Sequence, residues 1–183
     1  MYLNFGYLTD SRVPLKDKSA PLIVASCGTY RLRATKRLPT RRPRGRLDYQ
    51  LLYISAGKGI FWLDGIETEL PMGTVVLFRP GVPQLYSFPI EDRAEYYWCH
   101  FTGSDAENLL KKCRIPPEQT VFRLGTSSAH SMLFLQMIRE LQMKQEGYDT
   151  ILRMNLRHTL LLIGRSQAEE RVMGNKMLGE IES

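Results

Sequence analysis

The chain has 183 residues, of which 43% are hydrophobic, and it carries 25 Lys and Arg against 19 Asp and Glu, a formal net charge of +6. This length fits one domain, alone or with a helical appendage. It contains neither an apolar run long enough to cross a membrane nor the apolar segment of a signal peptide, so we expect a cytoplasmic protein without membrane contact. Its three cysteines, Cys27, Cys99 and Cys113, are too widely spaced to indicate a disulfide framework or a Cys-x-x-Cys metal site.

The positive charge is concentrated near the N-terminus. Residues 1–46 hold 11 of the 25 basic residues and only two carboxylates, and the excess is greatest in residues 36–46. Prolines forbid a regular helix there, and no aromatic residues are interleaved for stacking on nucleic-acid bases. The simplest interpretation is a solvated basic loop, and the alternative is that one or two arginines bind a phosphate or carboxylate. The preceding residues 1–19 show no clear period, and we expect a flexible arm.

Short apolar and aromatic runs then alternate with Gly, Pro and Asp-Gly, a pattern typical of short antiparallel strands joined by tight turns. Asp64-Gly65 is typical of a two-residue hairpin turn. We therefore expect a mainly β domain over residues 20–103, closed into a sandwich or barrel. The predicted strands are residues 21–27, 49–55, 60–63, 66–70, 74–78, 84–88 and 94–101.

The last of these strands is the most aromatic. Because side chains alternate along a strand, it should present two different faces, each apolar or amphipathic. One face should line the barrel interior and the other should pack on helices. The first face would consist of Tyr96, Trp98 and His100, and the second of Tyr97, Cys99 and Phe101.

Over residues 104–170 the apolar residues recur with the spacing of a helix, so we expect helices there. Ser104 and Glu107 have the spacing of a capping box, which predicts a helix over residues 104–114. A second helix is expected over residues 127–146, with Gly147 as its C-terminal cap. A third begins at Asp149 and carries an apolar stripe, which we expect to form a dimer interface. The stripe consists of Leu152, Leu156, Thr159, Leu160 and Ile163. Residues 171–183 include two glycines and predict a weak helix or a linker.

The residue inventory favours binding over catalysis. The three histidines, His100, His130 and His158, are far apart in sequence, and no carboxylate lies at ligand spacing, so we expect no metal site and no cofactor. Neither is there a nucleophile-elbow motif. Aromatic rings with hydrogen-bonding edges hold sugars and similar polyols, and the alternative for these rings is ordinary core packing. The candidate residues are Tyr49, Tyr86, Tyr96 and Trp98.

Several motifs, taken in order and spacing, resemble the N-terminal effector-binding and dimerisation domain of AraC-type transcription regulators. The resemblance covers residues 20–165 and lies in RPRGRLDYQLLYI (42–54), GKG (57–59), LPMGT (70–74), PGVPQLY (80–86) and EYYWCHFTG (95–103). It implies a cupin-like jelly-roll barrel that is followed by antiparallel helices pairing two subunits. It also implies a small molecule, usually a sugar, inside the barrel, with an N-terminal arm closing over it.

Matched residue by residue, the resemblance implies that Arg42 hydrogen-bonds the sugar, Tyr86 lines the pocket and Trp98 stacks on the ligand. Tyr96 stands where the arabinose-binding member has histidine, so arabinose itself is not implied. Gln84 stands where many members have histidine, which further disfavours a metal site. The family's DNA contact is made by a C-terminal helix-turn-helix pair, and we expect that half to be absent from this chain.

We therefore expect a ligand-sensing, homodimerising regulatory domain whose ligand is a sugar or related polar effector. Two alternatives stay open. One is a cupin-type enzyme such as a sugar isomerase, which would need a metal or an acid-base pair in the barrel. The other is a dimerisation scaffold whose barrel is filled by its own side chains.

Overall fold

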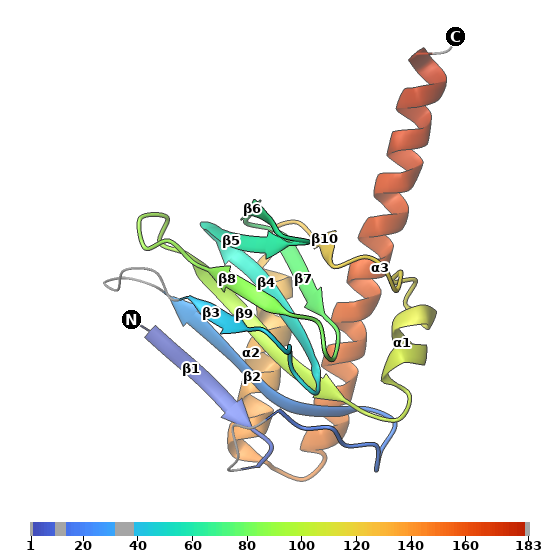
Figure 1. Ribbon diagram of the computed structural model, residues 1–183. Coiled ribbons are helices and arrows are strands. Elements are labelled where there is room, and N and C mark those ends of the chain that lie inside the picture. Colours follow the sequence, from blue (N-terminus) through green and yellow to red (C-terminus); the bar gives the residue numbers. More distant parts are fainter. Residues whose placement is uncertain (1, 10–13, 32–38, 182–183) are drawn as a thin grey trace.

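The computed structural model describes residues 2–9, 14–31 and 39–181 (Figure 1). Ten strands and three helices are found in this part of the chain. The strands are β1 (Tyr2–Tyr7), β2 (Ile23–Arg31), β3 (Thr40–Arg42), β4 (Tyr49–Ala56), β5 (Lys58–Leu63), β6 (Ile66–Pro71), β7 (Thr74–Phe78), β8 (Gln84–Ser87), β9 (Glu95–Thr102) and β10 (Val121–Arg123). The helices are α1 (Ala106–Lys112), α2 (Ser128–Met143) and α3 (Tyr148–Ile181).

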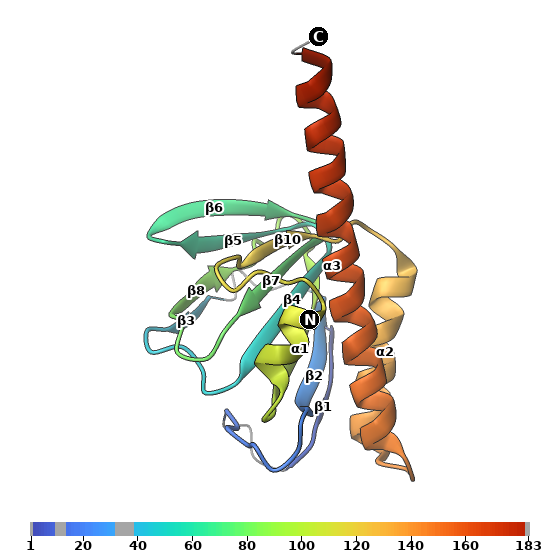
Figure 2. The same ribbon diagram turned by 90° about the vertical axis from the view of Figure 1, so that its right-hand side faces the viewer.

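The strands form two antiparallel sheets. The larger sheet has the order β1-β2-β9-β4-β7-β10, and the smaller has the order β3-β8-β5-β6. Figure 2 shows the two sheets as separate layers, with α2 and α3 against the outer side of the larger one. Helices α2 and α3 run antiparallel, and the C-terminal part of α3 projects beyond the sheets. The expected cupin-like jelly roll with C-terminal helices is confirmed.

The alternation of side chains along β9 divides the core into two parts, as predicted. Tyr97, Cys99 and Phe101 belong to an outer cluster between the larger sheet and the helices. Tyr96 and Trp98 belong to an inner cluster between the two sheets. Each face of the sheet therefore has its own apolar partner layer.

Local turn chemistry fixes some elements as expected. Asp64 and Gly65 both have positive φ, at 51° and 79°, so they form the tight turn between β5 and β6 that the sequence predicts. Ser127 caps α2, because its side chain accepts a hydrogen bond from the amide of Ala129.

Two predicted helix ends are wrong. Helix α1 is capped by Asp105 without a side-chain cap hydrogen bond, so the capping box at Ser104 does not form. The C-cap of α2 is Lys144 in the left-handed conformation, and not Gly147. Of the two alternatives for residues 171–183, a weak helix or a linker, the structure shows a helix, because α3 continues to Ile181. None of the helices within the described residues is long and apolar enough to span a membrane.

Three short strands have no counterpart in the sequence-based prediction. Strand β1 lies in the expected arm and pairs with β2 along its whole length. Strand β3 lies in the expected basic loop, and β10 follows α1 at the other edge of the larger sheet. Residues 1, 10–13, 32–38 and 182–183, which include parts of the predicted arm, basic loop and linker, lie outside the described residues.

Candidate functional site

A cluster of polar side chains surrounds the guanidinium of Arg42 between the two sheets. Strand β3 pairs with β8 so that Arg42 lies directly opposite Gln84. Arg42 Nη1 donates to Gln84 Oε1 at 2.7 Å, to Gln50 Oε1 at 3.3 Å and to Tyr86 Oη at 3.4 Å. Gln50 Nε2 also donates to Tyr86 Oη, at 3.2 Å. Since Gln50 comes from β4 in the larger sheet, Arg42 links the two sheets through side chains.

All three acceptors of Arg42 are neutral groups. The nearby carboxylate of Asp48 is occupied by Arg46, whose Nε and Nη2 lie 2.5 and 3.0 Å from its two oxygens. Both members of that pair are buried, and Asp48 also accepts from the amide of Leu15 at 3.2 Å. Among the residues that the structure describes, no carboxylate forms an ion pair with Arg42.

His100 lies on β9, directly opposite Gln50 on β4. Its imidazole is buried, and its Nδ1 is 2.7 Å from the hydroxyl oxygen of Ser26. Burial, together with the positive charges of Arg46 and Arg42, holds the pKa of His100 well below 6.5, so the ring is neutral near neutral pH. Its Nε2 has no hydrogen-bond partner within the described part of the chain.

An aromatic wall formed by Tyr96, Trp98, Phe88 and Tyr30 continues from this polar cluster. The rings of Phe88 and Tyr96 are parallel, with centroids 3.8 Å apart. Tyr30 stacks on Trp98 at 5.1 Å and on Tyr96 at 5.5 Å. Gly28 lies opposite Trp98 in the sheet, and a Cβ added there would be 2.1 Å from the indole ring. The missing side chain therefore creates the space that the indole occupies.

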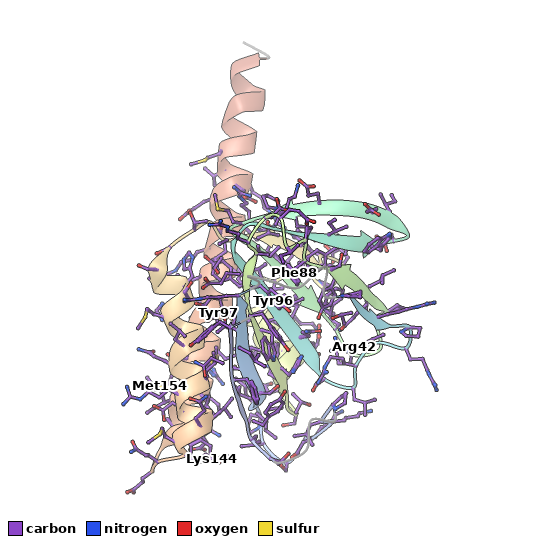
Figure 3. The ribbon with its side chains drawn as sticks, turned by 90° about the vertical axis from the view of Figure 1, so that its left-hand side faces the viewer. Arg42, Phe88, Tyr96, Tyr97, Lys144 and Met154 are labelled. Carbon is purple, nitrogen blue, oxygen red and sulfur yellow. The ribbon has the colours of Figure 1, made fainter. Side chains whose placement is uncertain are left out.

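The wall and the polar cluster share one boundary residue, Tyr86. Its ring lies 5.9 Å from that of Phe88, while its hydroxyl accepts the hydrogen bonds of the polar cluster. Burial raises the pKa of Tyr96, and the positive charge of Arg42 partly offsets that increase, so the two groups are electrostatically coupled. Aromatic faces and directional donors thus meet at Tyr86, and Figure 3 shows Phe88, Tyr96 and Arg42 on the barrel side of the molecule, away from the helices.

Four of the five predicted ligand-binding residues, Arg42, Tyr86, Tyr96 and Trp98, converge in this region. Tyr49 does not. It lies on the outer face of the larger sheet, where its ring stacks on Phe101 at 4.9 Å and its hydroxyl donates to Glu107 at 2.9 Å. Burial and Glu107 raise the pKa of Tyr49 to about 12. The placement of Tyr49 in the pocket is therefore corrected.

The sequence reasoning missed four contributors to the region, Gln50, Ser26, Tyr30 and Phe88, and it placed His100 on a face of the last strand without giving it a role in binding. Gln50 carried a detectable signal, because it is a polar residue inside an otherwise apolar strand. Tyr30 had no signal of its own, since its role depends on the pairing of β2 with β9. Gln84 was noted only as a replacement for histidine, whereas it accepts the shortest hydrogen bond from Arg42.

The stripe predicted as the dimer interface lies inside the protomer. Its five residues are at most 2% exposed and pack into the core beneath the larger sheet: Leu152, Leu156, Thr159, Leu160 and Ile163. They cannot contact a second subunit without unfolding the first, so the predicted interface is corrected. Among the α3 side chains that the structure describes, the exposed large apolar ones are instead Ile151, Met154, Leu161, Val172 and Met173.

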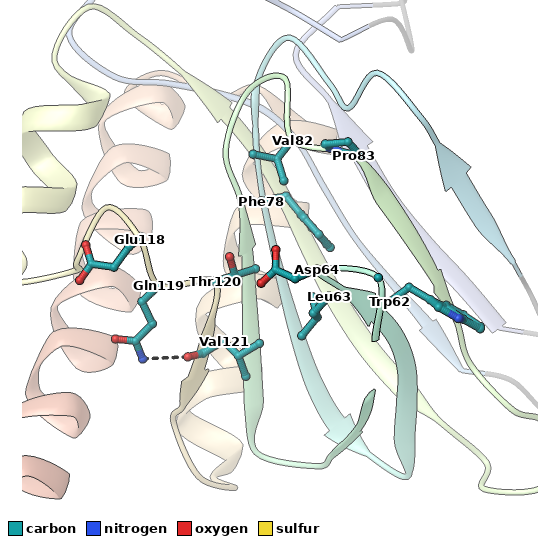
Figure 4. Close-up of a pocket in the computed structure, with 11 residues that line it drawn as sticks. Trp62, Leu63, Asp64, Phe78, Val82, Pro83, Glu118, Gln119, Thr120 and Val121 are labelled. Carbon is teal, nitrogen blue, oxygen red and sulfur yellow. Dashed lines mark hydrogen bonds between the residues drawn. The ribbon is translucent and has the colours of Figure 1, made fainter. Parts of the chain in front are cut away.

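A separate cleft of about 540 Å³ opens on the side of the barrel (Figure 4). Its walls come from the β5–β6 turn, the loop before β8 and the segment before β10, and they include Trp62, Asp64 and Glu118. Phe78 lines this cleft and also stacks on Tyr86 at 6.0 Å. Phe78 therefore borders the cleft and also contacts Tyr86, a member of the polar cluster.

Residues 14–20 lie against the strands at Asp48 and Thr102. The amide of Leu15 is tied to Asp48, and Asp17 exchanges backbone hydrogen bonds with the hydroxyl of Thr102 at 3.4 and 3.2 Å. These contacts hold part of the expected arm against the polar end of the site.

No group of three or more His, Cys, Asp or Glu side chains in the described residues is arranged to hold a metal ion.

Comparisons with known proteins point to one family. The model of the AraC-like ligand binding domain matches residues 26–161. The Msm operon regulatory protein of Streptococcus mutans is 28% identical over 102 residues, which are 55% of this chain and 34% of that protein. The chain thus spans about a third of the length of this curated relative.

Among solved structures, one AraC-like regulator shows the same fold at low identity. The AraC-like transcriptional activator CuxR has a TM-score of 0.52 at 14% identity, covering 80% of this chain and 52% of that one. ToxT from Vibrio cholerae, in a structure with bound unsaturated fatty acid, has a TM-score of 0.46 at 11% identity, covering 82% of this chain and 57% of that one.

Proposed function

Because the chain belongs to the family of AraC-like ligand-binding domains, we propose that it binds a sugar or related small polar effector between its two sheets and pairs two copies of a transcription regulator. The observation that carries the effector proposal is the meeting of Arg42 and its amide partners with the aromatic wall at Tyr86. Sugars are bound by this combination, in which ring faces contact C–H surfaces and a few polar groups fix the orientation. The relative named as an operon regulatory protein supports the regulatory role.

Effector binding would change the contacts that now close the site. Tyr30 stacks on Trp98, so a ligand that contacts this face of the indole must displace Tyr30. A ligand that leaves Tyr30 in place would stack on the Tyr30 ring instead. The segment held by Asp48 and Thr102 lies at the polar end. If this arm segment makes different contacts with the free and the ligand-bound barrel, effector binding shifts the equilibrium between the two states of the arm. In this proposal DNA is contacted by a helix-turn-helix segment, and not by the basic residues of this chain.

The effector site is tested by calorimetric titration with a panel of mono- and disaccharides. We expect Arg42→Ala and Trp98→Ala to abolish or strongly weaken binding of the sugar that the parent protein binds. Arg41→Ala is the matched control, because Arg41 is the exposed neighbour on the same strand. If both pocket variants bind as tightly as the control, the site lies elsewhere.

The dimer proposal moves to the exposed face of α3. Ile151, Met154, His158 and Leu161 are exposed and recur at intervals of three and four residues, the spacing by which helices pair along a seam. Met154 and Leu161 are 64% and 46% exposed, and exposed apolar side chains that lie together on one helix face are typical of a contact surface. Figure 3 shows Met154 on the helical layer, away from Arg42.

Sedimentation at micromolar concentration tests this interface. We expect Met154→Glu and Leu161→Glu to convert a dimer to a folded monomer. Met132→Glu on α2 is the control, because Met132 is 50% exposed and lies outside this face. A parent protein that sediments as a monomer, or a Leu161→Glu variant that stays dimeric, would contradict the proposal. Changes at Leu156 or Leu160 cannot serve here, since both side chains belong to the protomer core.

A further inference from the structure

Hydrogen-bond donors outnumber acceptors at the polar end of the barrel. Arg42 donates to Gln84 Oε1, which fixes the orientation of the Gln84 amide and leaves its Nε2 buried without a partner within the described residues. Gln84 is 1% exposed, so solvent does not supply that partner. A buried donor without an acceptor is destabilising by roughly 1–3 kcal/mol in general, and such groups commonly mark the place of a missing ligand or water.

Tyr86 adds a second donor. Its oxygen already accepts hydrogen bonds from Arg42 and from Gln50 Nε2, so its own proton must point toward a different acceptor. The described residues provide none. The buried Nε2 of His100 is likewise unpartnered there, and it carries the ring proton if the Ser26 hydroxyl donates to Nδ1.

The charge balance points the same way. Arg42 has one positive charge and only neutral acceptors, and it forms no ion pair with a carboxylate among the described residues, where Asp48 is held by Arg46. An arginine fork is completed best by a carboxylate, which offers two acceptor oxygens in matching geometry. A neutral sugar hydroxyl brings a donor of its own along with two acceptor lone pairs, so it offsets the surplus of donors less than a carboxylate, which only accepts.

We propose that the effector is a sugar acid, a polyhydroxy carboxylate whose carboxylate binds Arg42, Gln84 Nε2 and the Tyr86 hydroxyl. This inference rests on the proposed function and narrows it from sugars to their acids. The carbon skeleton lies along the aromatic wall that begins at Phe88 and Tyr96. The carboxylate accepts the surplus hydrogen bonds, and the wall contacts the C–H faces of the ring.

Matched pairs of ligands test the proposal by calorimetry on the whole chain. The probes are D-glucuronate with D-glucose and D-galacturonate with D-galactose, each at up to millimolar concentration, with acetate as a carboxylate that lacks the polyol. We expect at least one acid to bind about ten- to one-hundredfold more tightly than its neutral partner, because a charged hydrogen-bonded contact is gained. Acetate should bind more weakly than that acid.

Two substitutions locate the effect. Gln84→Glu places a carboxylate beside Arg42 with almost no change of shape, so the new carboxylate should pair with the guanidinium. The affinity for the sugar acid should then fall about ten- to one-hundredfold, and the melting temperature should not fall. Arg42→Met removes the charge and should erase the preference for acid over neutral sugar. Arg41→Met, on the exposed side of the same strand, should leave the preference intact.

The outcomes separate this inference from the function it rests on. A neutral sugar that binds as tightly as its acid, or a Gln84→Glu variant that keeps full acid affinity, overturns the carboxylate assignment and leaves sugar sensing in place. Acetate that binds as tightly as the sugar acids overturns the polyol part. If no probe binds, both the acid assignment and the sugar proposal fail.

Discussion

The two faces of the larger sheet are both aromatic, yet they meet very different partners. On the outer face, Tyr53 and Tyr97 lie 6.0 and 5.5 Å from Phe134 of α2, inside a cluster completed by helical leucines. On the inner face, Tyr96 and Trp98 belong to the same cluster as Tyr86, whose hydroxyl accepts a hydrogen bond from Arg42. The outer face is matched by an apolar helix layer, whereas the inner face meets Arg42 of the smaller sheet, a charge that lacks a carboxylate partner among the described residues.

This difference separates stability from binding on a single sheet. Apolar side chains on the outer face gain free energy by leaving water, and their helix partners are covalently part of the same chain. The polar groups on the inner face are held in place by strand pairing but are not all satisfied by each other. Changes on the outer face should therefore alter the free energy of unfolding, and changes on the inner face should mainly alter ligand binding.

Phe134→Ala should produce the largest effect. Phe134 is fully buried between α2 and the sheet, so its truncation removes apolar contact and leaves a cavity. We expect the free energy of unfolding to fall by about 3–5 kcal/mol. Urea unfolding measures it, and Met132→Ala on the same helix, with its half-exposed side chain, should change stability by less than about 0.5 kcal/mol. Equal losses for the two variants would mean that α2 does not pack on this face as described.

Most of the fold could be predicted from the sequence, because tight turns and alternating side chains are local signals. The Asp64-Gly65 turn and the two faces of β9 are examples. Strands β1, β3 and β10 were missed since each is a short strand at a sheet edge, defined by its neighbour more than by its own residues. Helix α3 runs through Gly174 and Gly179, although each glycine disfavours helix by about 1 kcal/mol.

The site could be predicted only in part. Arg42, Tyr86, Tyr96 and Trp98 were identified through the family resemblance, but Tyr49 was assigned to the wrong face. Both faces of β4 are largely apolar, so the pattern alone does not tell which one lines the barrel.

The prediction of the dimer interface on α3 was wrong for a related reason. The most apolar stripe of α3 was chosen, and the most apolar stripe is the one that the protomer buries in its own core. The second stripe on α3 mixes apolar side chains with a histidine, and its exposure becomes visible only once the helix is placed against the sheet.

Gly28→Ala tests how tightly the inner face is packed. The new methyl group would lie 2.1 Å from the Trp98 ring, so the indole must move. Overpacking of this kind usually lowers the free energy of unfolding by about 1–3 kcal/mol. Tryptophan fluorescence should report the displaced ring, and Trp98→Leu combined with Gly28→Ala should relieve the clash. Strictly additive losses in the double variant would show that the two residues are not in contact.

His100 should make stability depend on pH. Burial and the charges of Arg46 and Arg42 hold its pKa well below 6.5 in the folded state, while Ser26 and Gln50 are its neutral neighbours. Below pH 6.5 the unfolded chain then binds more protons than the folded one. The free energy of unfolding should fall on acidification, by at most about 1.4 kcal/mol per pH unit. His100→Gln should flatten this slope in urea unfolding, and an unchanged slope would argue against a buried neutral imidazole.

Tyr49→Phe should have the smallest effect and should sharpen the contrast between the faces. The variant loses the hydrogen bond to Glu107 but keeps the ring that stacks on Phe101. We expect a loss of about 1 kcal/mol in urea unfolding, because one partly buried hydrogen bond is removed. Effector affinity should match that of the parent, since Tyr49 lies on the far side of the sheet from Arg42. If Tyr49→Phe instead lost as much affinity as Arg42→Ala without a matching loss of stability, Tyr49 would have to line the pocket. The sheet would then not be divided into a structural face and a binding face.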